Sequence, residues 1–145
     1  MKAGHTQGDV CRKWFLGLEA AGYRFYVPEI ADYELRRELL RVGKTASLRR
    51  LDAFNEAEPD RYLPLTTRSV RRAAELWAAV RNAGRTTASP DALDGDVLIA
   101  AQAEQIIRIA QGSEGTLLIP AVVATANVSH LSALTNAVLW SDITL

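Results

Sequence analysis

Helical and strand-like patterns alternate along the chain, and this alternation restricts the possible folds more than any other feature. Apolar periodicity predicts helices over residues 8–21, 29–42, about 46–56, about 70–83 and 94–110. Short β-favouring runs predict strands at Tyr23–Val27, Arg61–Leu65, Thr116–Ala124 and Val138–Trp140. Strands that alternate with helices form a parallel sheet with helices on both faces. We therefore predict an α/β fold, a three-layer α/β/α domain with a short parallel sheet.

Length and composition place the chain among ordinary globular proteins. Its 145 residues suit one domain over residues 1–145, and 48% are hydrophobic while 23% are charged. No run approaches the roughly 18 consecutive apolar residues of a membrane span, and the polar start does not resemble a signal peptide. Cys11 is the only cysteine, which excludes a disulfide framework and a cysteine-built zinc site. We expect a cytoplasmic protein with no membrane partner.

Charge is unevenly distributed although the net charge is zero. Residues 24–85 hold 13 Lys/Arg against 9 Asp/Glu, whereas residues 86–145 hold one basic residue against six acidic ones. Of the 17 basic residues 14 are arginine, the side chain best suited to grip phosphate. Two interpretations stay open: solvated helix faces, or a protein that holds a polyanion on one surface and a cation on another.

Four polar residues are expected at one edge of the predicted sheet. Ligands of parallel sheets bind outside the carboxyl ends of the strands. Glu34 lies in the second turn of the helix that follows the Tyr23–Val27 strand. Asp94 and Asp96 begin a helix that must start at the same edge, and Asn127 follows the Thr116–Ala124 strand directly. We therefore expect Glu34, Asp96 and Asn127 to converge in space.

Carboxylate and amide oxygens in such a cluster are the ligands that Mg²⁺ or Mn²⁺ prefers. The same residues also have purely structural interpretations: Asp94 as a helix N-cap, Asp96 as a first-turn helix acid, Glu34 as a partner for an arginine, and Asn127 as a turn residue.

Other site chemistries have less support in the sequence. It contains no glycine-rich nucleotide-binding loop, no Walker loop and no nucleophile elbow. His5 and His130 lie at opposite ends of the chain, and the sequence identifies no third ligand that would join them in a metal site. A small-molecule-binding α/β module therefore lacks any fingerprint in this chain.

Several segments, in order, resemble the PIN-domain ribonucleases, and in particular their toxin-like (VapC-like) branch. They are Val27–Leu35, Glu75-Leu76-Trp77, Gly84-Arg85, Asp96–Ala103 and Thr125–Leu131, within a match from about Gly8 to Trp140. The first resembles the strand that leads into a helix with a Glu-Leu pair. The fourth resembles the family's Asp placed four residues before Ala-Ala, and the last its Thr-x-Asn/Asp segment.

The resemblance implies a function. Glu34 and Asp96 correspond to metal-binding catalytic carboxylates, Asn127 to the family's fourth Asp or Asn, and Asp94 to an auxiliary acid. The implied reaction is Mg²⁺- or Mn²⁺-dependent endonucleolytic cleavage of RNA by metal-activated water. The implied partners are the RNA substrate, a small antitoxin protein and a second copy in a homodimer.

The sequence departs from the family pattern at its start. The family opens with an apolar central strand that ends in a catalytic Asp, whereas here Met1-Lys2-Ala3-Gly4 lies almost at the first helix. Asp9 lies inside that helical pattern, so we do not assign it the missing role. We expect a truncated domain with weak metal binding. The alternative function is a non-catalytic PIN-domain remnant that binds RNA or a protein.

Overall fold

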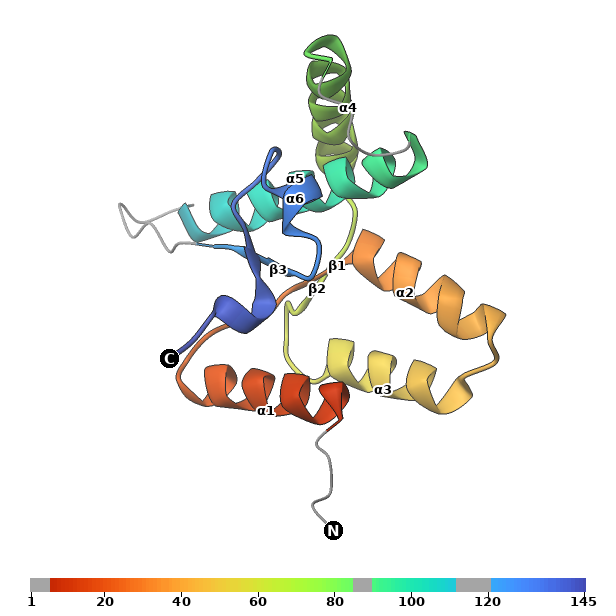
Figure 1. Cartoon of the computed structure of the whole chain (residues 1–145), viewed down its shortest axis with the longest axis vertical. Helices are drawn as coiled ribbons and strands as arrows, with labels where there is room; N and C mark the ends of the chain where they lie inside the picture. The colour runs from red at the N-terminus through yellow and green to blue at the C-terminus, as the bar shows by residue number, and fades with distance from the viewer. Residues whose placement is uncertain (1–5, 85–89, 112–120) are drawn as a thin grey trace.

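A computed structural model of the protein describes residues 6–84, 90–111 and 121–145 (Figure 1). The helices are α1 (Gln7–Ala20), α2 (Glu29–Arg41), α3 (Thr45–Glu56), α4 (Thr67–Asn82), α5 (Pro90–Gln111), α6 (Val128–Leu131) and a 3₁₀ turn, η1 (Trp140–Asp142). The strands are β1 (Val27–Pro28), β2 (Tyr62–Leu63), β3 (Val123–Thr125) and β4 (Ala137–Leu139). The predicted α/β class is confirmed, with helices predominating. No helix in the described part of the chain is long and apolar enough to cross a membrane.

The strands form two short parallel pairs. Val27 pairs with Tyr62 and Pro28 with Leu63, while β3 pairs with β4 over three residues. Within the described residues the two pairs are separate two-stranded sheets. The parallel pairing agrees with the prediction. β1 and β2 are shorter than predicted, whereas β4 has the predicted length and lies one residue earlier, at Ala137–Leu139.

The predicted strand Tyr23–Val27 is wrong in its boundaries, since only Val27 of that run lies in β1. The chain opposite residues 23–26 turns: Arg61 N donates to Glu58 O, and Asp60 has a positive φ of 63°. No extended partner is therefore available there. The predicted strand Thr116–Ala124 begins later, at Val123, and residues 116–120 lie outside the described residues.

Helix boundaries differ from the predicted ones by at most one residue, except at the start of α4, which is Thr67 and not about 70, and at the start of α5. This helix begins at Pro90, a residue well suited to a first helical position, and not near Asp94. Asp94 is therefore no N-cap, and Asp96 lies beyond the first turn. Asp9 belongs to a capping box at the start of α1, where its carboxylate accepts from Thr6 N at 3.1 Å.

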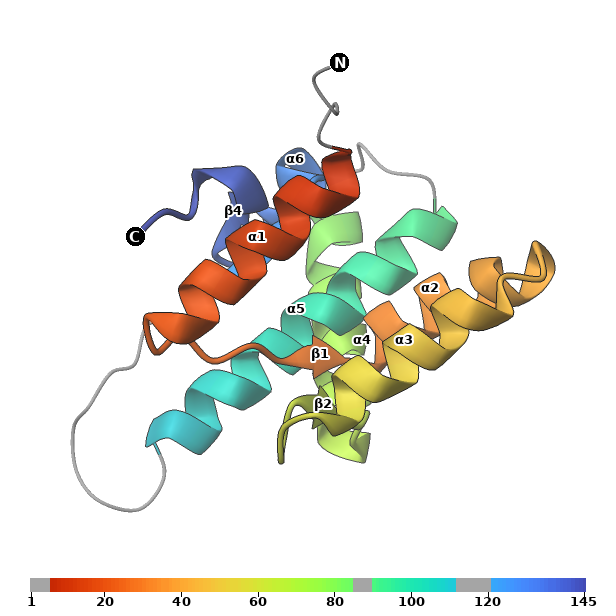
Figure 2. The same cartoon turned by 90° about the horizontal axis from the view of Figure 1, so that it is seen from below.

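The hydrophobic core lies between α4 and α5, which cross each other in Figure 1. Ala73 of α4 packs against Leu93, Val97 and Ala101 of α5. Small side chains on both helices let the two backbones approach closely. In Figure 2 the α2–α3 pair lies beside these helices.

An ion-pair network joins α2 to α3. Asp32 is buried, and Arg36 binds both of its carboxylate oxygens, at 2.8 and 3.0 Å. Arg36 also binds Asp52 of α3, and Asn55 of α3 donates to Asp32. The hydrogen bond from Arg36 holds the pKa of the Asp32 carboxyl below its ordinary value, with a smaller contribution from Asn55.

The buried side chain of Gln102 connects α5 to the start of α2 and to β2. Gln102 is 0% exposed. Its Oε1 accepts from Ile30 N at 3.3 Å, at the start of α2, and its Nε2 donates to Leu63 O at 2.8 Å, in β2. Ile30 N–H is one of the first-turn donors of α2 that have no partner within the helix, and Leu63 O lies at the end of the β1–β2 ladder, so one amide side chain satisfies two buried backbone groups.

We predict that Gln102→Leu lowers the free energy of unfolding. It would leave one buried N–H and one buried C=O without a partner, at about 1–3 kcal/mol each. The matched control is Gln105→Leu on the same helix, because Gln105 Oε1 is buried and has no hydrogen-bond partner among the described residues. Urea unfolding should show a large loss for the first variant and none for the second. Equal losses would contradict this account.

Candidate functional site

Glu34 and α5 meet at the edge where β1 ends. Glu34 is half-buried in the second turn of α2, and its carboxylate lies against Gly95 of α5. A Cβ atom at Gly95 would overlap Glu34 Oε1. The absence of a side chain at position 95 therefore brings the Glu34 carboxylate onto the backbone of α5, one residue from Asp96.

Asp96 is a partly buried carboxylate with one charged neighbour. Its side chain is 15% exposed, and Oδ2 lies 3.8 Å from Nδ1 of His130 in α6. Burial raises the pKa of the Asp96 carboxyl above its ordinary value, and the positive charge of a protonated His130 lowers it by less. A nearby cation would stabilise the ionised form of this carboxylate.

Asn127 is connected to Asp96 through His130. Its backbone N–H donates to Thr125 Oγ1 at 2.9 Å, which fixes the turn after β3, and its Nδ2 lies 3.2 Å from His130 Nδ1. The structure thus connects Asp96, His130 and Asn127 in one chain of contacts. Asp94 is exposed and makes no contact with these three residues in the described structure.

The chemistry of the donor set fits a hard divalent cation held by few protein ligands. No residue in the described part of the chain donates a hydrogen bond to the Glu34 carboxylate or pairs with it as a cation. Mg²⁺ is commonly bound through one or two carboxylates, with water and phosphate completing its coordination. No group of three His, Cys, Asp or Glu side chains among the described residues is placed to hold a metal by itself. Glu34 and Asp96 are the two carboxylates at this edge that such a site could use.

His130 is the residue that sequence reasoning missed. His130 is far along the chain from both His5 and Asp96, so no sequence spacing indicated that it lies close to Asp96. The available signal was local, since His130 comes three residues after Asn127. That spacing brings two side chains together once a helical turn follows the strand.

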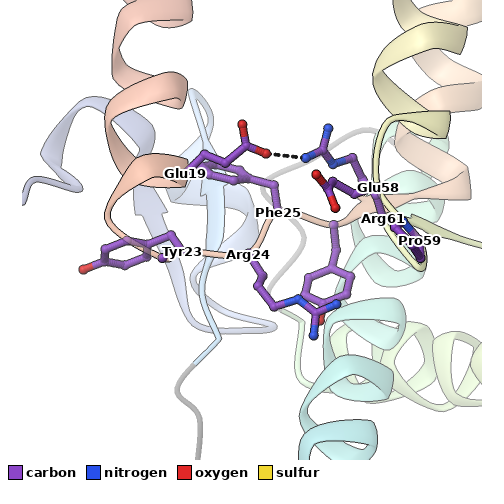
Figure 3. A pocket seen from close by; sticks show the side chains of 9 residues that line it. Glu19, Tyr23, Arg24, Phe25, Glu58, Pro59 and Arg61 are labelled. Atoms are coloured by element: carbon purple, nitrogen blue, oxygen red, sulfur yellow. Dashed lines mark hydrogen bonds and ion pairs between the residues drawn. The ribbon is translucent and has the colours of Figure 1, made fainter.

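A concavity, shown in Figure 3, lies near the amino ends of β1 and β2 and holds none of the predicted site residues. It is lined by residues of the α1 end, of the segment before β1 and of the loop before β2. Its most buried polar residue, Arg61, is 4% exposed. Arg61 pairs with Glu19 at 2.7 Å, donates to Phe54 O at 3.1 Å and stacks on the Phe54 ring. The two terminal nitrogens of this guanidinium are therefore held by the fold, whereas its buried Nε has no hydrogen-bond partner among the described residues.

We predict that Asp96→Asn stabilises the metal-free protein at neutral pH. The raised pKa means that the ionised carboxyl destabilises the folded state once pH exceeds the ordinary Asp value, and this penalty is complete above the folded-state pKa. The variant should raise the thermal midpoint at pH 7 and lose this advantage near pH 3, where both states are protonated. Asp94→Asn, at an exposed neighbour, should change little. A lower midpoint for Asp96→Asn at pH 7 would contradict this assignment.

Comparison with known proteins places the chain in a family. It matches the PIN domain over residues 1–107, a span that contains both Glu34 and Asp96 and ends before Asn127 and His130. No curated protein and no solved structure matches it. Because the match covers well over half of the chain, this protein belongs to the PIN-domain family.

Proposed function

We propose that this protein is a cytoplasmic, divalent-metal-dependent endoribonuclease of the toxin type. The observation that carries the proposal is the placement of the Glu34 carboxylate on Gly95, beside the partly buried Asp96. PIN-domain membership supports a nuclease. The segments that resemble the toxin-like branch support the finer assignment.

In the proposed mechanism Glu34 and Asp96 would hold Mg²⁺ or Mn²⁺, and the ion would supply positive charge that stabilises the reacting phosphate and makes water a better nucleophile. The protein fixes the two carboxylates on separate helices, so their spacing depends on how α2 packs against α5. Gly95 permits the close approach, and the partial burial of Asp96 limits competition from water. Asn127 is proposed as an auxiliary oxygen ligand, whereas Asp94 remains a prediction from resemblance alone.

The basic half of the chain is the proposed RNA-binding surface. Arg37, Arg49 and Arg50 are exposed on α2 and α3 and available to phosphate. Arg36 is not, because Asp32 and Asp52 already bind its guanidinium. The proposed RNA contacts on α2 and α3 are therefore assigned to Arg37, Arg49 and Arg50.

Partners of the toxin type remain proposals from resemblance, with one supporting observation. Large apolar side chains on and just after α2 are exposed: Tyr33, Leu35, Leu40 and Val42. Such side chains are suited to an interface with a small antitoxin or with a second copy of the chain.

The second candidate function is a non-catalytic PIN domain that binds RNA or a protein. It is favoured by the absence of a three-ligand metal cluster among the described residues. Catalysis distinguishes the two candidates, because a binding module would retain RNA without cutting it.

We predict that the protein cleaves single-stranded RNA in the presence of Mn²⁺. The cleavage rate should fall by about 100-fold or more in Glu34→Gln and in Asp96→Asn, because each variant loses a principal electrostatic contribution to the transition state. Glu38→Gln, one turn along α2 and paired with Arg41, is the matched control and should keep wild-type activity. Gel analysis of end-labelled RNA measures the rates. RNA binding without cleavage by the wild type would favour the second candidate function.

We also predict that Gly95→Ala weakens Mg²⁺ binding without unfolding the protein. The added methyl group would displace Glu34 Oε1, the end of a flexible side chain, so the carboxylate moves while the helix remains. Gly17→Ala in α1 is the control, because nothing lies within 4 Å of its new Cβ. It should gain about 0.5–1 kcal/mol of stability from helix propensity and leave Mg²⁺ affinity unchanged. Unchanged Mg²⁺ affinity in Gly95→Ala, by isothermal titration, would remove Glu34 from the site.

A further inference from the structure

The concavity of Figure 3 has no part in the function described so far. Its volume is about 250 Å³, just below the range of about 300–1,000 Å³ that holds drug-sized ligands, so it suits a single flat ring system. It lies near the amino ends of β1 and β2, whereas Glu34 and Asp96 lie at the edge where β1 ends. A ligand in this concavity would therefore bind apart from the proposed cation.

Four charged side chains line the concavity, and two of them already neutralise each other. Arg61 is held by Glu19 at 2.7 Å and by Phe54 O at 3.1 Å. Among the described residues, Glu58 and Arg24 form no ion pair. The lining thus offers a ligand one free carboxylate and one free guanidinium.

The Glu58 carboxylate is placed to recognise a hydrogen-bond donor. It accepts no hydrogen bond within the described part of the chain, and in Figure 3 it points into the concavity, toward the segment that carries Arg24 and Phe25. An ionised carboxylate only accepts, and its two oxygens match two adjacent N–H donors. Of the four RNA bases, guanine alone presents two adjacent donors, N1–H and N2–H₂, on its Watson–Crick edge.

The same lining offers surfaces on which a base can stack. Phe25 and Tyr26 contribute aromatic rings, and the Phe25 ring is held by Phe15 at 4.5 Å and Trp14 at 5.7 Å between ring centroids. The Arg24 guanidinium lies over the Tyr26 ring, 5.6 Å from its centroid. Bases stack on aromatic rings and on arginine planes, and a guanidinium without an ion pair can also bind phosphate.

We propose that this concavity binds the guanine base of a nucleotide. Glu58 accepts from guanine N1–H and N2–H, Phe25 and Tyr26 provide the stacking surface, and Arg24 binds the phosphate. A free nucleotide and an RNA strand share this chemistry, so assigning the guanine to RNA rests on the proposed function. In that case the concavity recognises a base away from the cleaved bond, because it and Glu34 lie at opposite edges of β1.

The test is calorimetric titration of the full chain with guanosine 5′-monophosphate (GMP) and with inosine 5′-monophosphate (IMP), which lacks the 2-amino group. Wild type should bind GMP about tenfold more tightly, because the 2-amino group donates to a charged acceptor. Glu58→Gln should lose this preference, since one acceptor oxygen becomes a donor. Glu56→Gln, at the exposed last residue of α3 and outside the concavity, is the matched control and should keep it.

Three results would overturn the guanine site: no binding of GMP, equal affinity of the wild type for GMP and IMP, or a preference for GMP that survives Glu58→Gln. The role of Arg24 has its own comparison. Wild type should bind GMP about threefold more tightly than guanosine, the scale of an exposed ion pair, and Arg24→Gln should bind the two equally. An unchanged ratio in Arg24→Gln would overturn the phosphate contact.

Fluorescence anisotropy distinguishes the two sources of guanine. A single-stranded oligouridine with one guanosine should bind the wild type more tightly than the same strand with inosine there, and Glu58→Gln should remove the difference. Equal binding of the two strands, with a preference for GMP over IMP, would overturn the assignment to RNA and support a free nucleotide as the ligand.

The outcomes separate the inference from the proposed function. A Glu58-dependent preference for GMP, without RNA cleavage by the wild type under any divalent ion, would support the guanine site and overturn the nuclease. Mn²⁺-dependent RNA cleavage by a wild type that binds GMP and IMP equally would overturn the guanine site and leave the nuclease standing.

Discussion

The two hydrogen bonds of the Gln102 side chain determine where α5 lies, and the rest of the structure depends on that position. One bond reaches the first residues of α2 and the other reaches β2, so three elements meet at one fully buried amide. The strands are only two or three residues long and supply few ladder hydrogen bonds of their own. In a buried, low-dielectric setting a satisfied amide of this kind specifies one arrangement, because a shift of α5 would leave polar groups unpaired.

The same position of α5 assembles the site. Asp96 lies six residues before Gln102, or about 9 Å along the helix. Glu34 lies four residues after Ile30, the residue whose N–H the amide accepts. Fixing Ile30 against Gln102 therefore places the next turn of α2 over the first turns of α5, where Gly95 leaves space for a carboxylate. The position of α5 set by Gln102 therefore determines both the fold and the candidate site. Helix α6 joins the candidate site through the contact of His130 with Asp96.

The sequence predicts local features of this protein better than long-range ones. Apolar periodicity locates the helices because the buried face of each helix appears in its own sequence. The predicted stop signals are also found, since Gly43 and Gly84 take positive φ just after α2 and α4. The predicted strand at Tyr23–Val27 is longer than β1, because the pairing of residues 23–26 depends on a distant loop that turns at Asp60. Glu34, Asp96 and Asn127 could be named from topology and resemblance. The contact of Glu34 with Gly95 and the place of His130 depend on tertiary packing, which no local pattern records.

The central claim is that Glu34 and Asp96, on two helices, act on a single divalent cation, and a double-mutant cycle on Mn²⁺ affinity tests it most directly. Glu34→Gln, Asp96→Asn and the double variant would be titrated with Mn²⁺ by isothermal calorimetry under the same conditions as the wild type. If both carboxylates hold one ion, the double variant should bind little worse than the weaker single variant, because the first substitution already removes most of what the second could. Fully additive losses, or wild-type affinity in either single variant, would contradict the account.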